Sequence, residues 1–547
     1  MKRAWFSRFI SKHLNLWTIT SMICAAMVLL TILYVLTGLF RPSNENWQNI
    51  KQYLLTDYML GSLKLVLFTS FFTTLIGVVL AWLVVGFTFP LRNFYKWASI
   101  LPLAVPPYIA AYTYSYMTGY TGIIQANLRN NFSIVLPPGT IEVMSERGAI
   151  FILTLCLFPY IFIITRVFLD FQSASFIENA RLLGHRSYSI FFKVVLPLAR
   201  PAIMAGVMLV AFEVLSDYGV ANYFGVQTVS TAIFQIWFGM YDIESALKLA
   251  AWLMLAVIAI FILERLLRRN RRYAGKPNRS NRLKPQQLKG MKAWLATMFC
   301  TIVFLLAFVV PVLQLVIWTI QYGSTIWRSD FLTLTSNTLN GAALATVFIL
   351  VIALLSARAA RMFTSPFIQA LTRLMSAGYS VPGAIIAIGV LALFISLDEA
   401  LAPLYTIIGK EQGALVLSLS LTMLIAGYVI RFIATGYGSL EAGYDKMPRA
   451  YTEAARTLGR SSLATFFRIE LPLLRGALLS GFILTFVEII KELPLTLLLR
   501  PFNYDTLATR AYQYAIDERI VDAALPSLLL VLIGLVSVFI IIKNERG

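Results

Sequence analysis

The feature that most constrains this chain is a series of long apolar runs. A helix needs about 20 apolar residues to cross a bilayer, and the sequence contains twelve candidate spans. They lie near 17–39, 60–87, 97–117, 149–169, 202–224, 246–264, 293–320, 338–357, 374–397, 412–433, 477–499 and 524–542. Prolines or acids interrupt the third and fifth runs, so re-entrant or pore-lining segments are an alternative there. The sequence therefore predicts an all-α integral membrane protein with about twelve transmembrane helices.

Composition supports a membrane protein and excludes several other classes. The chain is 59% hydrophobic and 13% charged, whereas a soluble domain is about 25% charged. This balance excludes a disordered chain and argues against a water-soluble enzyme. Cys24, Cys156 and Cys300 lie in apolar runs, and there are only two histidines, so no spacing typical of a metal or redox centre is present. The ligands of any bound metal stay unknown.

The net charge of +20 is distributed unevenly along the chain. With the N-terminus inside, 34 of the 46 lysines and arginines fall on the inner side of the predicted spans. This is the positive-inside pattern, and it predicts that both termini are cytoplasmic. Eleven basic residues cluster in 265–292, which we interpret as a linker near anionic lipid headgroups. A nucleic-acid arm is disfavoured because neither a pattern of interleaved aromatic residues nor a recognition fold accompanies the cluster, so we expect no nucleic-acid partner.

Two segments of the chain repeat each other at a fixed offset of 275 residues. Segment 178–184 reads Glu-Asn-Ala-Arg-Leu-Leu-Gly, and 453–459 reads Glu-Ala-Ala-Arg-Thr-Leu-Gly. Each is followed by Phe-Phe, three further residues and Leu-Pro, at 191–197 and 466–472. Six predicted spans separate the copies, and an even number places both on the same side of the membrane. The repeat is therefore parallel rather than inverted.

The repeat divides the chain into five parts. Two permease-like domains are predicted at 58–265 and 337–547, each preceded by one further span. The complete division is 1–57 (cytoplasmic N-terminus, first span and outer loop), 58–265 (first domain), 266–292 (basic linker), 293–336 (seventh span and outer loop) and 337–547 (second domain).

The repeated segments predict a helix-turn-helix on the cytoplasmic side. Glu-Ala-Ala-Arg favours a short helix, and its alanines are expected to form a face that another surface can approach closely. Gly184 and Gly459 are expected to end that helix with positive φ. Leu-Pro is expected to begin the next helix, where proline suits the first turn.

At this point the pattern resembles a known family. Glu-Ala-Ala, three residues, Gly, nine residues, Ile, one residue and Leu-Pro resembles the loop of ABC importer permeases of the binding-protein-dependent type. The second copy matches fully, while the first departs at Asn179 and Val194. The resemblance implies two parallel six-helix repeats of the type I, MetI-like fold, with each loop coupling to an ATPase. The implied coupling residues are Glu178, Ala180, Gly184, Leu196, Pro197, Glu453, Ala454, Ala455, Gly459, Leu471 and Pro472.

The partners follow from what the chain lacks and from the resemblance. A phosphate-binding loop of the form G-x-x-x-x-G-K-[ST] is missing from the sequence. The chain is therefore expected to be a transport subunit rather than an enzyme, with no cofactor of its own. The resemblance implies a separate ABC ATPase that uses ATP, in two copies, and a periplasmic substrate-binding protein. It also implies a multi-pass location in the bilayer of a bacterial inner membrane.

Ionisable residues in and just after the fifth span of each half are candidates for a translocation path or gate. Such residues are costly inside a membrane and usually face protein or water. Glu213 and Glu488 are repeat-equivalent and are predicted to face each other. The alternative is a structural acid paired with a nearby base, as Lys491 offers to Glu488. The candidate residues are Glu213, Asp217, Glu488, Lys491 and Glu492.

The same region resembles the fused permeases of ferric-iron importers. Carboxylates on a path suit Fe3+, a hard cation that prefers oxygen ligands. Fused permeases for thiamine or for a phosphonate share the twelve-span layout and remain alternatives. A twelve-span secondary transporter would need no ATPase, but it does not account for the paired loops. A membrane-embedded enzyme is disfavoured because no constellation of nucleophile, base and metal ligand is present.

Overall fold

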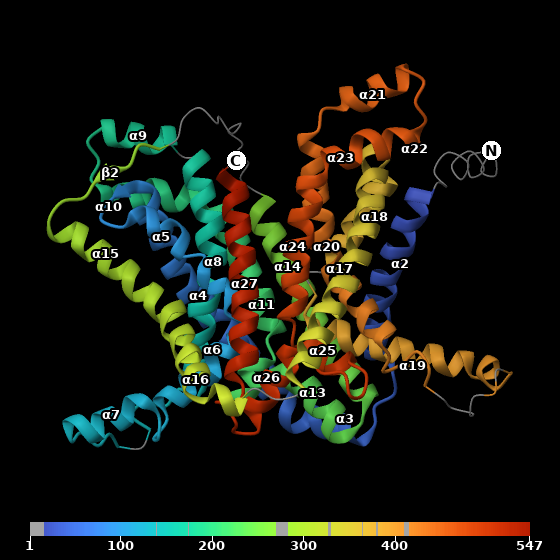
Figure 1. The fold of residues 1–547 in the computed structure, drawn as a ribbon, viewed down its shortest axis with the longest axis horizontal. Helices are drawn as coiled ribbons and strands as arrows, with labels where there is room; N and C mark the ends of the chain where they lie inside the picture. The colour runs from blue at the N-terminus through green and yellow to red at the C-terminus, as the bar shows by residue number, and fades with distance from the viewer. Residues whose placement is uncertain are drawn as a thin grey trace. The chain divides into compact units, whose positions relative to one another are not determined.

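The computed structural model describes residues 16–546, except for 138, 173, 270–282, 327–329, 364, 379–380, 408 and 410–414. The basic N-terminal residues and most of the basic linker therefore lie outside the described residues. The described chain is almost wholly helical (Figure 1). It divides into two compact units, each made of three separate stretches of chain. Unit 1 is Met1–Pro42, Ile236–Met254 and Asp330–Thr509, and unit 2 is Ser43–Gln235, Leu255–Ser329 and Arg510–Gly547.

Unit 2 contains the first copy of the sequence repeat. Its long helices are apolar for most of their length, as a lipid environment requires. Its elements are α3 (Glu45–Asn49), η2 (Ile50–Leu54), α4 (Leu55–Gly86), β1 (Phe87–Thr88), α5 (Arg92–Ala98), η3 (Leu101–Ala104), α6 (Pro107–Thr118), α7 (Ile123–Phe132), α8 (Glu146–Gln172), α9 (Ala174–Leu182), α10 (Ser187–Ile190), η4 (Phe191–Val195), α11 (Leu196–Ser216), α12 (Gly219–Tyr223), β2 (Gln286–Gln287), α15 (Met291–Phe304), η5 (Leu305–Val309), α16 (Val310–Ile326) and α27 (Ala524–Arg546).

Unit 1 contains the second copy. Helices α13 (Val229–Met240), α14 (Ile243–Arg269) and α26 (Leu507–Ile516) include residues of both units. The remaining elements of unit 1 are α2 (Leu16–Thr37), η1 (Gly38–Phe40), α17 (Phe331–Met362), α18 (Pro366–Ala377), α19 (Gly383–Ile407), α20 (Leu421–Lys446), α21 (Arg449–Thr457), α22 (Ser462–Thr465), η7 (Phe466–Glu470), α23 (Leu471–Leu473), α24 (Arg475–Ile490) and α25 (Pro494–Leu499).

The same three-helix core occurs in each unit. Helices α4, α8 and α11 pack on one another in unit 2, and their repeat equivalents α17, α20 and α24 do so in unit 1. Equivalent glycines let these helices approach closely. A β-carbon on Gly206 would lie 3.0 Å from the Cα of Ile161, and one on Gly481 would lie 3.1 Å from a methyl carbon of Leu350. Small residues at such crossings are typical of membrane helices, whose association depends on close packing.

The units do not coincide with the two halves of the sequence. Helix α2, the first predicted span, packs on α17, α18 and α19 of the second repeat. Helix α16, which precedes the second repeat, packs on α6 and α27 in unit 2. Each unit therefore combines one repeat with a span that precedes the other repeat in the sequence. The two halves of the sequence are therefore joined by the packing of α2 and α16 as well as by the linker.

Among the described residues, nine helices are long and apolar enough to cross a membrane, or ten if one bent pair counts as a single span. The bent pair is Ser462–Leu473 and Arg475–Ile490, with a bend of 68°. The nine helices are Trp17–Phe40, Glu45–Gly86, Glu146–Asp170, Ser187–Ser216, Ile243–Ile262, Met291–Gly323, Phe331–Met362, Gly383–Ile407 and Leu421–Lys446.

Several predicted spans differ from the helices observed. The run 97–117 is broken between α5 and α6, where Pro102, Pro106 and Pro107 remove backbone donors and restrict the residues before them. The run 374–397 begins in α18, and its membrane helix starts only at Gly383, just after Pro382. The runs 202–224 and 477–499 end as helices at 216 and 490 and continue into the short helices α12 and α25. The last run, 524–542, lies within α27 as predicted.

Candidate functional site

The first repeated loop consists of α9, a glycine turn and α10. Gly184 has a φ of +78°, as its place in the sequence predicts. The Gly184 amide donates to the Arg181 carbonyl at 3.0 Å, and the His185 amide donates to the Ala180 carbonyl at 3.2 Å. These two bonds form a Schellman motif, which closes the end of a helix with a left-handed residue. A short helix is thereby held rigidly at an angle to the next one.

The second loop has the same construction. The Gly459 amide donates to the Arg456 carbonyl and the Arg460 amide to the Ala455 carbonyl, both at 3.0 Å. Gly459 has a φ of +76°, and the Ser461 side chain caps α22 by accepting from the Ala464 amide. Figure 1 shows α21 and α22 beyond the end of α20, at an angle to it. The predicted helix-turn-helix is therefore present in both copies.

The exposed surface of these loops includes large apolar side chains among charged ones, and it differs from the surface that the sequence suggested. Ala180 and Ala455 are buried in their own unit, so of the predicted alanine face only Ala454 is exposed. Large side chains beside the glycines are open instead: Leu182 is 85% exposed and Leu458 is 80% exposed. Similar side chains nearby are Leu183, Tyr188, Leu463 and Phe467. Large apolar side chains gathered on an exposed surface are typical of interaction sites.

The Leu-Pro pairs stand at the start of α11 and of α23, as predicted, but each of these α-helices continues a helix that begins earlier in the chain. Leu196 and Leu471 follow π-helical turns at 191–195 and 466–470, so the helix already starts in α10 and in α22. A π-turn widens the helix and accommodates Pro197 or Pro472, which has no amide to donate. Both copies have this π-helical turn at the same offset. The turn runs from Phe-Phe to the residue before Leu-Pro, which accounts for the repeated spacing between the two pairs.

The linker supports the first loop. Strand β2, at the described end of the linker, pairs in parallel with β1 at the end of α4. Arg181 donates to the backbone carbonyls of Lys284 at 2.6 Å and Gly86 at 3.0 Å, while Glu178 accepts from the Lys284 amide at 3.3 Å. Burial lowers the pKa of Arg181, and the charge of Glu178 partly opposes this. Glu178, a predicted coupling residue, therefore holds the linker against the loop.

The second loop is supported by a buried ion pair. The Arg358 guanidinium lies 3.2 Å from the Glu470 carboxylate, and both side chains are almost fully buried. Arg358 also donates to the Ser462 carbonyl at 2.5 Å. Its guanidinium carbon lies 4.0 Å from the ring centre of Trp17 and 4.5 Å from that of Phe466, within cation–π range. Helix α2 is thus joined to the base of this loop.

The acidic residues after the fifth spans have local structural partners. Lys491 lies 2.7 Å from Glu488, the pairing that the alternative reading of these acids predicted. The Asp217 carboxylate accepts from the amides of Val220 and Ala221 and so caps α12. Its repeat equivalent Glu492 caps α25 by accepting from the Leu495 amide. These contacts give Glu488, Asp217 and Glu492 structural partners within their own units. A role of these residues on a translocation path stays a prediction.

Glu492 has a second partner that sequence reasoning missed. Arg431 of α20 lies 3.4 Å from the Glu492 carboxylate. Gly383 makes room for this pair, because a β-carbon there would lie 2.0 Å from an Arg431 nitrogen. The repeat-equivalent positions in unit 2 are Tyr108 and Cys156. Only the second copy therefore combines a positive charge with the capping acid.

Comparison with known proteins places these loops in a family. The family described as a binding-protein-dependent transport system inner membrane component matches the sequence twice, over residues 73–272 and 349–543. Together the matches cover more than half of the chain. The chain belongs to this family. Each matched segment contains one of the repeated loops, so the predicted all-α membrane permease with two repeated modules is confirmed.

Relatives of this permease have several transport roles. Over 514 residues it is 24% identical to the Fe(3+)-transport system permease protein FbpB 2 of Haemophilus influenzae, covering 92% of this chain and 91% of the relative. It is 26% identical over 416 residues to the ferric transport system permease protein FbpB of Actinobacillus pleuropneumoniae, covering 71% of this chain and 57% of the relative. It is also 29% identical over 225 residues to the molybdenum transport system permease protein ModB of Escherichia coli, covering 40% of this chain and 96% of the relative.

Metal-binding groups are sparse in the part of the permease that the structure describes. No three or more histidine, cysteine, aspartate or glutamate residues gather there in a way that would hold a metal ion. The described cysteines Cys24, Cys156 and Cys300 are buried and free.

Proposed function

We propose that this importer permease carries ferric iron across the membrane. The observation that supports it most is the alignment with the Fe(3+)-transport permease of Haemophilus influenzae, which runs almost end to end in both chains. The molybdenum permease aligns with less than half of this chain. Acids near the fifth spans agree with a hard trivalent cargo. Thiamine, a phosphonate and molybdate are the competing substrates that a test must include.

The two repeated loops are proposed to dock on a separate ABC ATPase, one copy for each loop. Their exposed leucines and aromatic residues supply the apolar centre that such an interface needs. The Schellman turns and the supports beneath them make each loop rigid enough to transmit force. ATP would be bound and hydrolysed by the partner, and this chain would hold no cofactor. The predicted coupling residues then divide into those that dock, such as Ala454, and those that shape the loop, such as Pro472.

Both loops and both termini are proposed to be cytoplasmic. The linker carries the densest positive charge in the chain, and cytoplasmic loops carry such an excess. Its described end contacts the first loop through Lys284, so the linker and that loop share one side of the membrane. A periplasmic binding protein would then deliver the cargo to the opposite side, in a bacterial inner membrane.

The path is proposed to run beside the acids after the fifth spans. Glu213, Asp217, Glu488, Lys491 and Glu492 are the candidate residues. Closure of the ATPase would move the two loops, and the permease would expose the path alternately to each side. Asp217 and Glu492 already cap helices, so we expect them to hold the shape of the path. Glu213 and Glu488 are then the residues expected to meet the cargo.

Uptake of radiolabelled cargo tests this proposal. A strain that lacks the permease gene is supplied with the wild-type gene or an empty vector, and uptake of Fe3+, thiamine, a phosphonate and molybdate is measured. We expect the gene to restore Fe3+ uptake alone. Restoration of another substrate without Fe3+ would contradict the proposed cargo.

The same assay tests the path. The double variant Glu213→Gln and Glu488→Gln keeps the shape of both side chains but removes their charges. We expect Fe3+ uptake to fall at least about tenfold, the effect of about 1.4 kcal/mol at the barrier, while the ATPase still co-purifies. Uptake equal to wild type would return these acids to a structural role.

A further inference from the structure

Two adjoining cavities in unit 2 lie where the first loop meets the membrane helices. One, of about 660 Å³, opens between the loop and the described end of the linker. The other, of about 840 Å³, continues from it along α4 and α15. Ser187, Gln286 and Lys292 line both cavities, so the two form one continuous depression. Its size suits a ligand larger than a simple ion.

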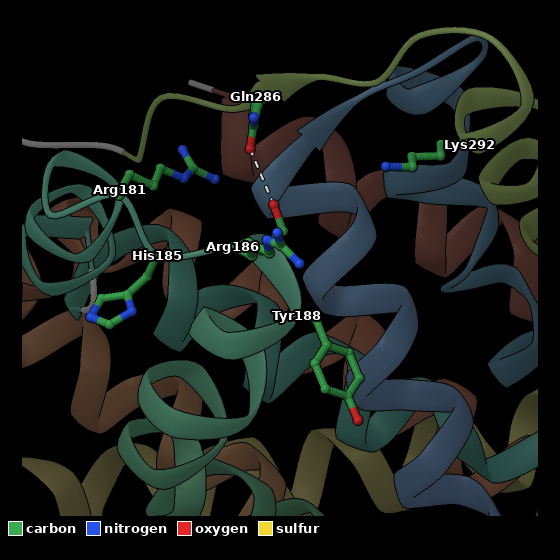
Figure 2. Close-up of a pocket in the computed structure, with 8 residues that line it drawn as sticks. Arg181, His185, Arg186, Tyr188, Gln286 and Lys292 are labelled. Atoms are coloured by element: carbon green, nitrogen blue, oxygen red, sulfur yellow. Dashed lines mark hydrogen bonds between the residues drawn. The ribbon is translucent and has the colours of Figure 1, made fainter.

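The first cavity is basic. Arg181, Arg186 and Lys292 line it, together with His185 and Tyr188, and none of the described residues that line it is an acid. Figure 2 shows Arg181 and Lys292 on opposite sides of the opening, with Arg186 between them and Gln286 bonded to Ser187. Glu178 offsets part of the Arg181 charge from outside the lining, and Arg186 and Lys292 remain exposed. Arginine and lysine converging in this way suit a phosphate group.

The second cavity is mainly apolar and extends towards the membrane. Val79 and Leu83 line it from α4, and Leu295, Ala296 and Phe299 line it from α15. Both helices are apolar enough to span the bilayer. A ligand that fills both cavities must therefore carry a negative head and an apolar tail.

We propose that this depression binds an anionic phospholipid of the cytoplasmic leaflet. The phosphate lies among Arg186, Lys292 and Arg181, and an acyl chain lies against Leu295 and Phe299. Basic pockets between helices on the cytoplasmic side are suited to anionic headgroups. The site belongs to the first copy only, because Ser461 stands at the position equivalent to Arg186. The lipid would brace the linker against the first loop.

Site-specific photo-crosslinking tests the proposal. A benzophenone amino acid replaces Phe299 in the depression or, as the control, Leu67, which is 58% exposed on α4 outside it. The full-length permease is embedded in bilayers where phosphatidylglycerol is the minor component and phosphatidylethanolamine the major one. Mass spectrometry then gives the anionic share of the lipid adducts. We expect that share to be at least about tenfold higher at 299 than at 67, given roughly one factor of five for each basic contact.

Paired charge variants identify what holds the lipid. Arg186→Gln with Lys292→Gln is expected to abolish the enrichment, while zwitterionic adducts at 299 continue to report a folded depression. Arg373→Gln with Lys446→Gln removes the same charge from exposed positions elsewhere and should leave it intact. Equal anionic shares at 299 and 67 in the wild type would overturn the proposal. The proposal would also be overturned if the wild type showed no lipid enrichment at 299 and the variant with Arg186→Gln and Lys292→Gln no longer co-purified with the ATPase. The basic cavity would then belong to the interface with the ATPase.

Discussion

Replacing Gly459 with aspartate is expected to abolish transport while the chain still inserts into the membrane. Gly459 closes the Schellman turn with a φ of +76°, and a β-carbon there would meet nothing within 4 Å. Aspartate tolerates this backbone region better than most residues, so the loop should keep its shape at a cost of about 1–2 kcal/mol. The added charge lies beside the exposed Leu458. An unpaired charge buried at a docking surface costs about 3–5 kcal/mol, which weakens docking more than about a hundredfold.

A matched variant separates charge from backbone strain. Gly459→Asn has nearly the same size and the same tolerance of positive φ, but it is neutral. We expect it to retain much more uptake and ATPase binding than Gly459→Asp, with both variants present in membranes at wild-type levels. Equal uptake by wild type and Gly459→Asp would show that this turn is not part of the docking surface.

Removing one partner of the Arg358–Glu470 pair is expected to be the most destabilising change in unit 1. Arg358→Leu leaves the Glu470 carboxylate buried without its cation, although Tyr444 still donates to it at 3.1 Å. Such a loss costs about 3–5 kcal/mol of folding free energy. The second loop also loses the bond from Arg358 to Ser462. We expect a lower thermal unfolding temperature in detergent and weaker ATPase binding.

The first repeat supplies the control for this change. Leu83 and Val195 occupy the positions equivalent to Arg358 and Glu470, so both positions are apolar in the first repeat. The double variant Arg358→Leu and Glu470→Val should therefore recover most of the lost stability, because apolar replacement of a buried ion pair is often neutral. A double variant less stable than Arg358→Leu alone would contradict this account of the pair.

The repeat and the loops could be predicted from the sequence because their signals are local. An offset of 275 residues, a glycine after a short helix and a Leu-Pro pair are all visible without contacts. The positive φ of Gly184 and Gly459 confirms the turn. The bounds of individual spans were harder to predict, because hydropathy alone does not register how Pro102, Pro106 and Pro107 break a helix within an apolar run.

The remaining features depend on partners distant in sequence. Nothing in the composition of α2 indicates that it packs on the second repeat, since apolar helices carry little directional information. The pairing of Arg358 with Glu470, and of Arg431 with Glu492, joins residues that are far apart in the chain. Leu182 and Leu458 belong to the repeated motif, but in a chain so rich in apolar residues their exposure could not be predicted from the sequence.

Thiol labelling gives the most direct test of the central claim that the two loops dock on a separate ATPase. The cysteines Cys24, Cys156 and Cys300 are buried, so a single cysteine at Leu183 or Leu458 is the main reactive site in isolated membranes. Phe502→Cys, at a residue 83% exposed outside the loops, is the control. With the ATPase co-expressed, we predict labelling at 183 and 458 to slow at least about tenfold, because the centre of an interface excludes water, and labelling at 502 to stay unchanged. Equal labelling of all three sites with and without the ATPase would contradict the account.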